Sequence, residues 1–121
     1  MSSEALHEDP SVLSPATRDR HRAIVSLMEE LEAVDWYQQR AEATADPELR
    51  AVLEHNRDEE MEHAAMVIEW LRRTWPKAAE QIAAYVNRQG PIVDHAGEPG
   101  EGDAGPHEEG SLGIGSLKPE A

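Results

Sequence analysis

The sequence contains no cysteine and no phenylalanine, and aromatic residues make up only 4% of its 121 positions. Without cysteine, the chain forms no disulfide, uses no thiol nucleophile and holds no Cys-ligated zinc. With so few aromatic side chains, a self-contained hydrophobic core would be thin. No apolar run approaches the roughly 20 residues that cross a bilayer, so we predict no membrane partner. The first ten residues also lack the basic flank and apolar stretch of a secretory signal.

Basic residues are scarce as well. The chain has 11 Lys and Arg against 25 Asp and Glu, which gives a formal net charge of -14. Such a chain repels phosphate backbones, so we predict no nucleic-acid partner. The length allows one small domain at most.

The middle of the chain has the apolar periodicity of α-helices. Gly and Pro interrupt this pattern at only four places, which are Ser14-Pro15, Asp46-Pro47, Trp75-Pro76 and Gly90-Pro91. Because Pro is favoured in the first helical turn, these pairs predict helices over about 15–44, 47–74 and 76–88. The short break after residue 44 predicts an antiparallel hairpin. The fold class is therefore all-α, an antiparallel two-helix hairpin plus a short third helix, within a helical domain spanning 16–91.

Three such helices cannot surround a core. The apolar stripes of the hairpin must be covered by another copy of the chain, so we predict an obligate homo-oligomer.

The two ends of the chain differ from the middle in composition. Residues 1–15 are predicted to be a flexible N-terminus. Residues 92–121 carry seven acids, one base and seven of the eight glycines, so we expect a disordered acidic linker over 92–109. The final segment, 110–121, has three apolar anchors, Leu112, Ile114 and Leu117, which can fill pockets on a partner as an extended peptide. The alternative is an inert end.

Three ionisable residues fall inside the apolar stripes of the predicted hairpin. On a helical wheel Glu30 lies between Ala23 and Tyr37, while Glu60 and His63 lie on the apolar face of the second helix. A buried carboxylate without a partner is costly, and no Lys or Arg lies near the centre of either stripe. A bound cation would satisfy all three groups.

The donor types indicate which metals would suit this set. Carboxylate plus imidazole suits Fe(II) or Mn(II), and Zn(II) also fits. Di-iron helical bundles need one Glu from each of two helices and a Glu-x-x-His from each of two others, so this chain supplies half a di-metal site. Two chains would complete it around a two-fold axis. An alternative to metal binding is an ion pair between Glu60 and Arg57. Tyr37 could hydrogen-bond a ligand carboxylate.

A second set of candidate residues lies outside the stripes. It consists of four acids with one aromatic residue and one histidine, which are Glu29, Glu32 and Trp36 on the first helix and His55, Glu59 and Glu62 on the second. One interpretation is a solvated acidic face. The other is a surface that attracts divalent cations and supplies the inner residues.

Three segments together resemble encapsulated ferritins. They are MEELEAVDWY at 28–37, HNRDEEMEHAAM at 55–66 and the tail GSLGIGSLK at 110–118, which looks like a cargo-loading peptide of encapsulin shells. The resemblance implies a ferroxidase that oxidises Fe(II) to Fe(III) with dioxygen in the lumen of an encapsulin nanocompartment within the cytoplasm.

The resemblance also implies particular residues and partners. Glu30, Glu60 and His63 of two chains would form a di-iron centre in an annular assembly of dimers, a decamer in the family. Glu29, Glu32 and Trp36 would be an outer metal-attracting site, and His55, Glu59 and Glu62 a further metal contact, with other divalent cations possible at these outer positions. The tail would dock on the shell protein. Two alternatives stay open, a non-catalytic helical adaptor and a Mn- or Zn-binding relative.

Overall fold

A computed structural model describes residues 5–95 of the chain, and every regular element in that range is helical. The order is η1 (Pro10–Val12), α1 (Pro15–Ala43), α2 (Pro47–Thr74), α3 (Pro76–Tyr85) and α4 (Ile92–His95). The chain divides into two compact units, Met1–Thr74 and Trp75–Ala121, which are described separately. The predicted tail at 110–121 and most of the predicted linker lie outside the described residues.

Helix α1 begins and ends at local capping signals. The Ser14 hydroxyl accepts a hydrogen bond from the Thr17 amide at 3.1 Å, and Pro15 occupies the first turn. At the other end, Thr44 is in an extended conformation and its amide donates to the Arg40 carbonyl. The predicted end at about residue 44 is therefore confirmed.

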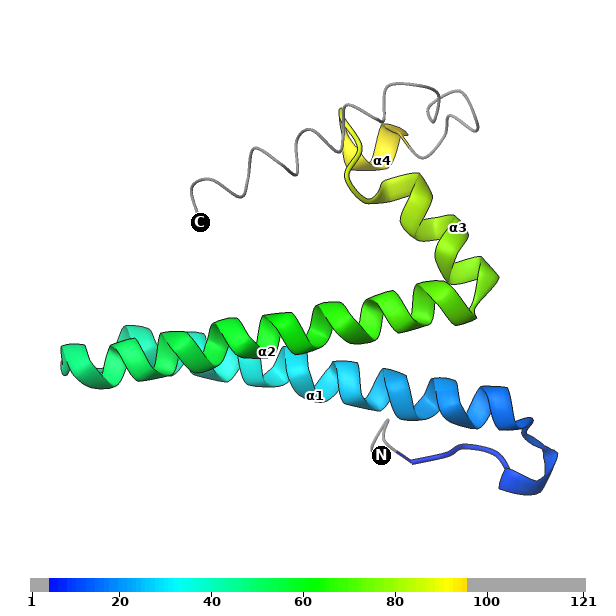
Figure 1. Ribbon diagram of the computed structural model, residues 1–121, viewed down its shortest axis with the longest axis horizontal. Coiled ribbons are helices and arrows are strands. Elements are labelled where there is room, and N and C mark those ends of the chain that lie inside the picture. The colour runs from blue at the N-terminus through cyan, green and yellow to red at the C-terminus, as the bar shows by residue number, and fades with distance from the viewer. Residues whose placement is uncertain (1–4, 96–121) are drawn as a thin grey trace. The chain divides into compact units, whose positions relative to one another are not determined.

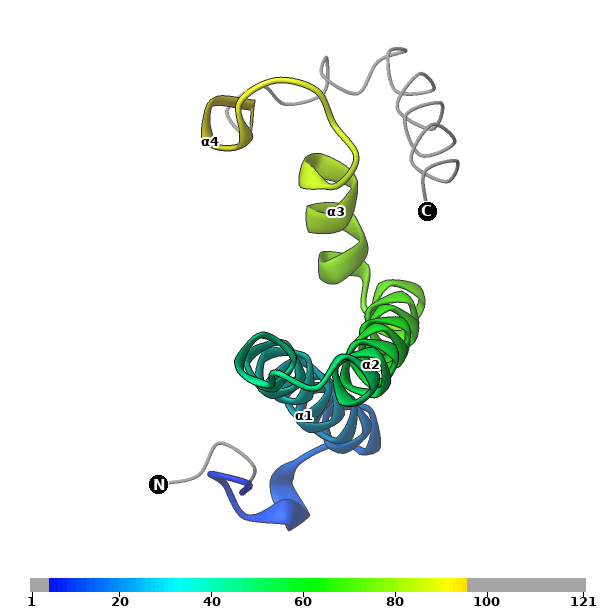
Figure 2. The ribbon, with the colours of Figure 1, turned by 90° about the vertical axis from the view of Figure 1, so that its left-hand side faces the viewer.

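The turn between the long helices is stabilised from both sides. The Asp46 carboxylate accepts a hydrogen bond from the Glu48 amide at 2.9 Å, which starts α2. Arg50 donates to the carbonyls of Ala41 at 3.0 Å and Thr44 at 2.8 Å, so its guanidinium ties α2 to the end of α1. The two helices consequently run antiparallel and side by side, as Figures 1 and 2 show. The hairpin expected from Asp46-Pro47 is confirmed.

The hairpin encloses very little. Within the described residues only Ala41 and Ala64 are buried apolar residues. Small side chains at these points let the two helices approach closely. Many large apolar side chains stay exposed, including Ile24, Met28, Leu31, Met61, Met66, Ile68 and Trp70. The expectation of a thin core is confirmed. The uncovered apolar surface supports the prediction that the chain self-associates.

A short turn that was not predicted precedes α1. Asp9 accepts a hydrogen bond from the Ser11 amide and caps η1. Arg18 then donates to the carbonyls of Pro10 and Leu13, both at 2.8 Å, which fixes the turn against the first residues of α1.

The C-terminal unit departs from the predicted bounds at two places. Helix α3 ends at Tyr85 rather than near residue 88, because Asn87 adopts a left-handed conformation with φ of 61°. Arg88 folds back and donates to the carbonyls of Ala83 and Ala84. The other difference is α4, a single helical turn at 92–95 in a segment assigned to the linker. None of the described helices is apolar over a stretch long enough to cross a membrane.

Candidate metal centre

The hairpin brings the middle of α1 against the middle of α2. Arg20 donates to the Thr74 carbonyl at one end of the hairpin, and Arg50 donates to the Ala41 carbonyl at the other. These two contacts fix the register of the helices. Glu30, halfway along α1, therefore faces Glu60 and His63 on α2.

The three side chains converge on one point. His63 Nδ1 lies 3.4 Å from Glu30 Oε1 and 3.3 Å from Glu60 Oε1. One ligand atom from each residue can be chosen so that all three lie within 4.8 Å of one another. Within residues 5–95 this is the single group of three or more His, Cys, Asp or Glu residues that meets this condition. We refer to Glu30, Glu60 and His63 as the inner cluster.

The two carboxyl groups of the inner cluster titrate differently. The hydrogen bond with Glu60 raises the pKa of Glu30, and burial and the Glu60 charge add to this effect. The same hydrogen bond lowers the pKa of Glu60, with His63 contributing in the same direction. A proton shared by the two carboxyl groups is therefore held more readily by Glu30 than by Glu60.

The imidazole of His63 favours its charged form. Burial alone lowers its pKa, but the hydrogen bonds to Glu60 and Glu30 and their negative charges outweigh burial and raise it. A protonated His63 thus partly neutralises the two carboxylates, as a bound cation would.

The inner cluster is only partly covered in the single chain. The side chains of Glu30, Glu60 and His63 are 25%, 24% and 43% exposed in the single chain. Two helices cover only one side of each residue, so the other side stays open. The bland alternative of an Arg57–Glu60 pair is not what the structure shows, since Arg57 binds Asp58 at 2.9 Å and Gln38 at 2.6 Å.

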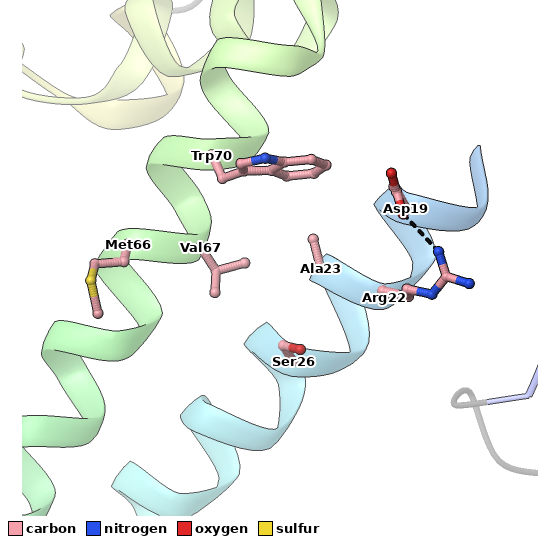
Figure 3. Close-up of a pocket in the computed structure, with 7 residues that line it drawn as sticks. All are labelled: Asp19, Arg22, Ala23, Ser26, Met66, Val67 and Trp70. Carbon is pink, nitrogen blue, oxygen red and sulfur yellow. Dashed lines mark hydrogen bonds and ion pairs between the residues drawn. The ribbon is translucent and has the colours of Figure 1, made fainter. Parts of the chain in front are cut away.

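A cavity of about 490 Å³ lies next to the inner cluster and was not predicted. Ser26 lies one turn before Glu30, and Val67 lies one turn after His63. The lining residues are Asp19, Arg22, Ala23, Ser26, Met66, Val67 and Trp70. Figure 3 shows the Trp70 indole extending from α2 over Ala23 toward the Asp19–Arg22 ion pair of α1.

The other predicted metal-attracting residues lie on the outside of the hairpin. His55 Nε2 is 3.1 Å from Glu59 Oε2, and these side chains are 69% and 53% exposed. Glu62 is exposed, and no interaction described for residues 5–95 joins it to that pair. Glu29, Glu32 and Trp36 are exposed on one face of α1.

Tyr37 and Trp36 share a neighbour that the sequence analysis missed. The guanidinium carbon of Arg40 lies 5.5 Å from the Tyr37 ring centroid and 5.8 Å from that of Trp36. The spacing of an Arg three and four residues after aromatic residues on a helix was the available signal. The predicted hydrogen bond from Tyr37 to a ligand carboxylate stays a prediction.

Comparisons with known proteins show the family of the chain. Residues 5–89 match the EncFtn-like family. An encapsulated ferritin-like protein of Rhodospirillum rubrum is 57% identical over 99% of this chain and 92% of its own length. A ferritin-like protein of Thermotoga maritima is 48% identical over 92% of this chain and 96% of its own length.

A solved structure gives the same result for the fold. The crystal structure of protein ne0167 from Nitrosomonas europaea is 53% identical and superposes with a TM-score of 0.70, covering 74% of this chain and 98% of that one. The chain therefore has the ferritin-like helical fold and belongs to the EncFtn-like family of encapsulated ferritins. The resemblance stated from the sequence is confirmed.

Proposed function

We propose that this chain is a ferroxidase that oxidises Fe(II) to Fe(III) with dioxygen. The observation that carries the proposal is the inner cluster, in which two carboxylates and one imidazole from facing helices converge within 4.8 Å. These donors suit Fe(II), and in this reaction Fe(II) is the substrate, which gives an electron to dioxygen.

A single chain supplies too few ligands for the reaction. Three donor residues leave most coordination positions of an iron ion open, and the inner cluster is partly exposed. Two copies would bring four carboxylates and two imidazoles together, and the four negative charges would balance two Fe(II) ions. We therefore propose that a second copy completes a four-helix bundle around a di-iron site, within an annular homo-oligomer.

Each residue has a definite part in this proposal. Glu30, once deprotonated, would hold both ions through its carboxylate, and Glu60 and His63 would each hold one ion. The exposed acids Glu29 and Glu32, beside Trp36, raise the local concentration of Fe(II). His55, Glu59 and Glu62 are a further contact for cations. Tyr37 hydrogen-bonds a ligand carboxylate.

We also propose that the chain works as cargo of an encapsulin shell in the cytoplasm and supplies ferric iron for storage in the lumen. The Rhodospirillum rubrum relative is described as encapsulated. The tail anchors Leu112, Ile114 and Leu117 would dock on the shell protein as an extended peptide. Co-expression with a shell protein tests this assignment. Deleting residues 110–121 should prevent loading and leave iron oxidation unchanged, whereas loading without the tail would refute it.

The central experiment measures oxidation and assembly on the same sample. Fe(II) is added to metal-free protein under anaerobic conditions, the particle mass and metal content are measured, and air is then admitted. We expect one di-iron unit per two chains and fast growth of ferric absorbance compared with Fe(II) in buffer. Tight Mn or Zn binding without iron oxidation would favour the metal-binding alternative, and absence of any metal would favour the helical adaptor.

A further inference from the structure

Arg40 lies against two aromatic rings at once. Its guanidinium carbon is 5.8 Å from the ring centroid of Trp36 and 5.5 Å from that of Tyr37. A guanidinium within about 6 Å of an aromatic centroid is attracted to the ring face. A single positive charge therefore stabilises the positions of two neighbouring side chains on α1.

The two rings belong to different faces of the helix. Trp36 follows Glu32 by four residues and Glu29 by seven, so it shares their exposed face, and its own exposure is 48%. Tyr37 follows Glu30 by seven residues and is half-buried, so it shares the face of the inner cluster. Arg40 thus connects the outer acidic face with the inner one.

The contacts of Arg40 differ from those of the ion-paired arginines in the hairpin. Arg22 pairs with Asp19 at 2.7 Å, Arg57 pairs with Asp58, and Arg73 pairs with Glu69 at 2.7 Å. In the interactions described for residues 5–95, Arg40 contacts the two rings and no carboxylate.

We propose that Arg40 is a positioning residue for the proposed iron site. It holds Tyr37 on the face of Glu30 and holds Trp36 on the face of Glu29 and Glu32. Its positive charge also weakens the attraction of the neighbouring surface for cations. This inference rests on the proposed function for its kinetic consequences, but the contact with the rings can be tested without iron.

The first experiment measures ring mobility in metal-free protein. In a Trp70→Phe, Trp75→Phe background, Trp36 is the tryptophan that emits. Arg40→Gln should lower the fluorescence anisotropy of Trp36 and shift its emission to the red, because the ring loses its cationic neighbour. Arg73→Gln removes the same charge at a side chain that is 71% exposed and should change neither quantity. Arg40→Lys should give intermediate values.

The second experiment separates kcat from KM for Fe(II) oxidation in the native tryptophan background. Arg40→Gln should lower kcat by about 2- to 5-fold, as expected from the loss of the cation–π contact with Tyr37, the ring on the face of the inner cluster. It should also lower KM for Fe(II) by about 2-fold, because a repulsive charge has been removed. Arg40→Lys should keep the parent KM, since the charge remains. A general structural defect would not lower kcat and the KM for Fe(II) together.

The outcomes decide between the two proposals. Identical fluorescence of the Arg40→Gln, Arg73→Gln and parent proteins overturns the positioning role, and so does an unchanged kcat and KM. If Arg40→Gln fails to fold by circular dichroism, Arg40→Lys supplies the same comparison. If the parent protein does not oxidise Fe(II), the proposed function fails, while the fluorescence of the metal-free protein still decides whether Arg40 holds the rings.

Discussion

Helix α2 carries two groups that combine a histidine with a carboxylate, and they differ in what lies opposite. In the inner cluster His63 is 3.3 Å from Glu60 and 3.4 Å from Glu30 on the facing helix. In the outer pair His55 is 3.1 Å from Glu59 on the same helix, and both side chains are more than half exposed. Equal residue types at similar spacing therefore produce a three-residue site in one place and a surface contact in the other.

The comparison shows that local spacing does not make a metal site by itself. A Glu and a His three or four residues apart meet on any helix. The third residue of the inner cluster, Glu30, comes from α1, and the hairpin places it there by fixing the register at both ends. The hydrogen bonds and charges that the three groups share then shift their pKa values.

The largest predicted effect comes from removing one ligand. Glu30→Ala, Glu60→Ala or His63→Ala should reduce Fe(II) oxidation to the rate in buffer, because each removes a donor from both halves of the proposed site. Glu80→Ala removes an exposed carboxylate of α3 that belongs to neither group and should keep a rate close to that of the parent. The measurement is ferric absorbance after aerobic mixing. Parent-like rates in all three inner variants would refute the enzyme assignment.

Acidification should weaken metal binding at the inner cluster more than at the outer pair. The pKa values of Glu30 and His63 are raised, so both groups hold protons at a pH where they are ordinarily released, and a cation must displace those protons. Affinity should fall as the pH drops toward and below these raised values, by about tenfold per pH unit for each proton displaced.

Anaerobic titration with Co(II) at several pH values measures this effect, and Glu60→Ala serves as the control that lacks the inner site. An affinity that stays constant from about pH 8 to about pH 6 would contradict the proton competition.

A smaller effect is expected on the outer face. Glu32→Ala should slow iron oxidation by about 2- to 5-fold at limiting Fe(II), because local attraction of cations is reduced, and should leave the rate at saturating Fe(II) unchanged. Metal content per chain should stay at the parent value. An unaltered rate at limiting Fe(II) would count against a cation-collecting role for this face.

The smallest effect concerns stability without metal. Replacing Glu30 and Glu60 together by Leu should raise the free energy of unfolding of the metal-free protein by about 1 kcal/mol, since functional polar groups in a partly apolar interface are held at a cost. Glu59→Leu at the exposed outer pair should change it by less than about 0.5 kcal/mol. Urea unfolding in the presence of a chelator measures the free energy of unfolding of both variants. Equal changes in the two variants would contradict the difference between the inner cluster and the outer pair.

Much of the hairpin could be predicted because its signals are local. Ser14-Pro15 and Asp46-Pro47 cap their helices through their own side chains and fixed φ angles, so the bounds of α1 and α2 were predicted closely. The predicted end of α3 was wrong by about a turn. The early end depends on the left-handed conformation of Asn87. The sequence signal for this conformation is weak, because Asn adopts it only occasionally.

The inner cluster was partly predictable. Helical periodicity places Glu30, Glu60 and His63 on the stripes that must face each other, so their identity followed from the sequence. Their partial exposure in the single chain did not, because exposure depends on which surfaces a second helix covers. The cavity lined by Trp70 was missed for the same reason. The position of Arg40 over two rings was missed although its spacing is a local signal.

The sequence by itself determined the helices, their breaks, the acidic surface and the three residues that interrupt the apolar stripes, since each of these depends on contacts between residues a few positions apart. Only the tertiary structure decided that His63 meets carboxylates from both helices, that Arg57 of α2 binds Gln38 of α1, and that two alanines alone are buried among the described residues. Those facts depend on the register and separation of two helices, which are set jointly by contacts distributed along the whole hairpin.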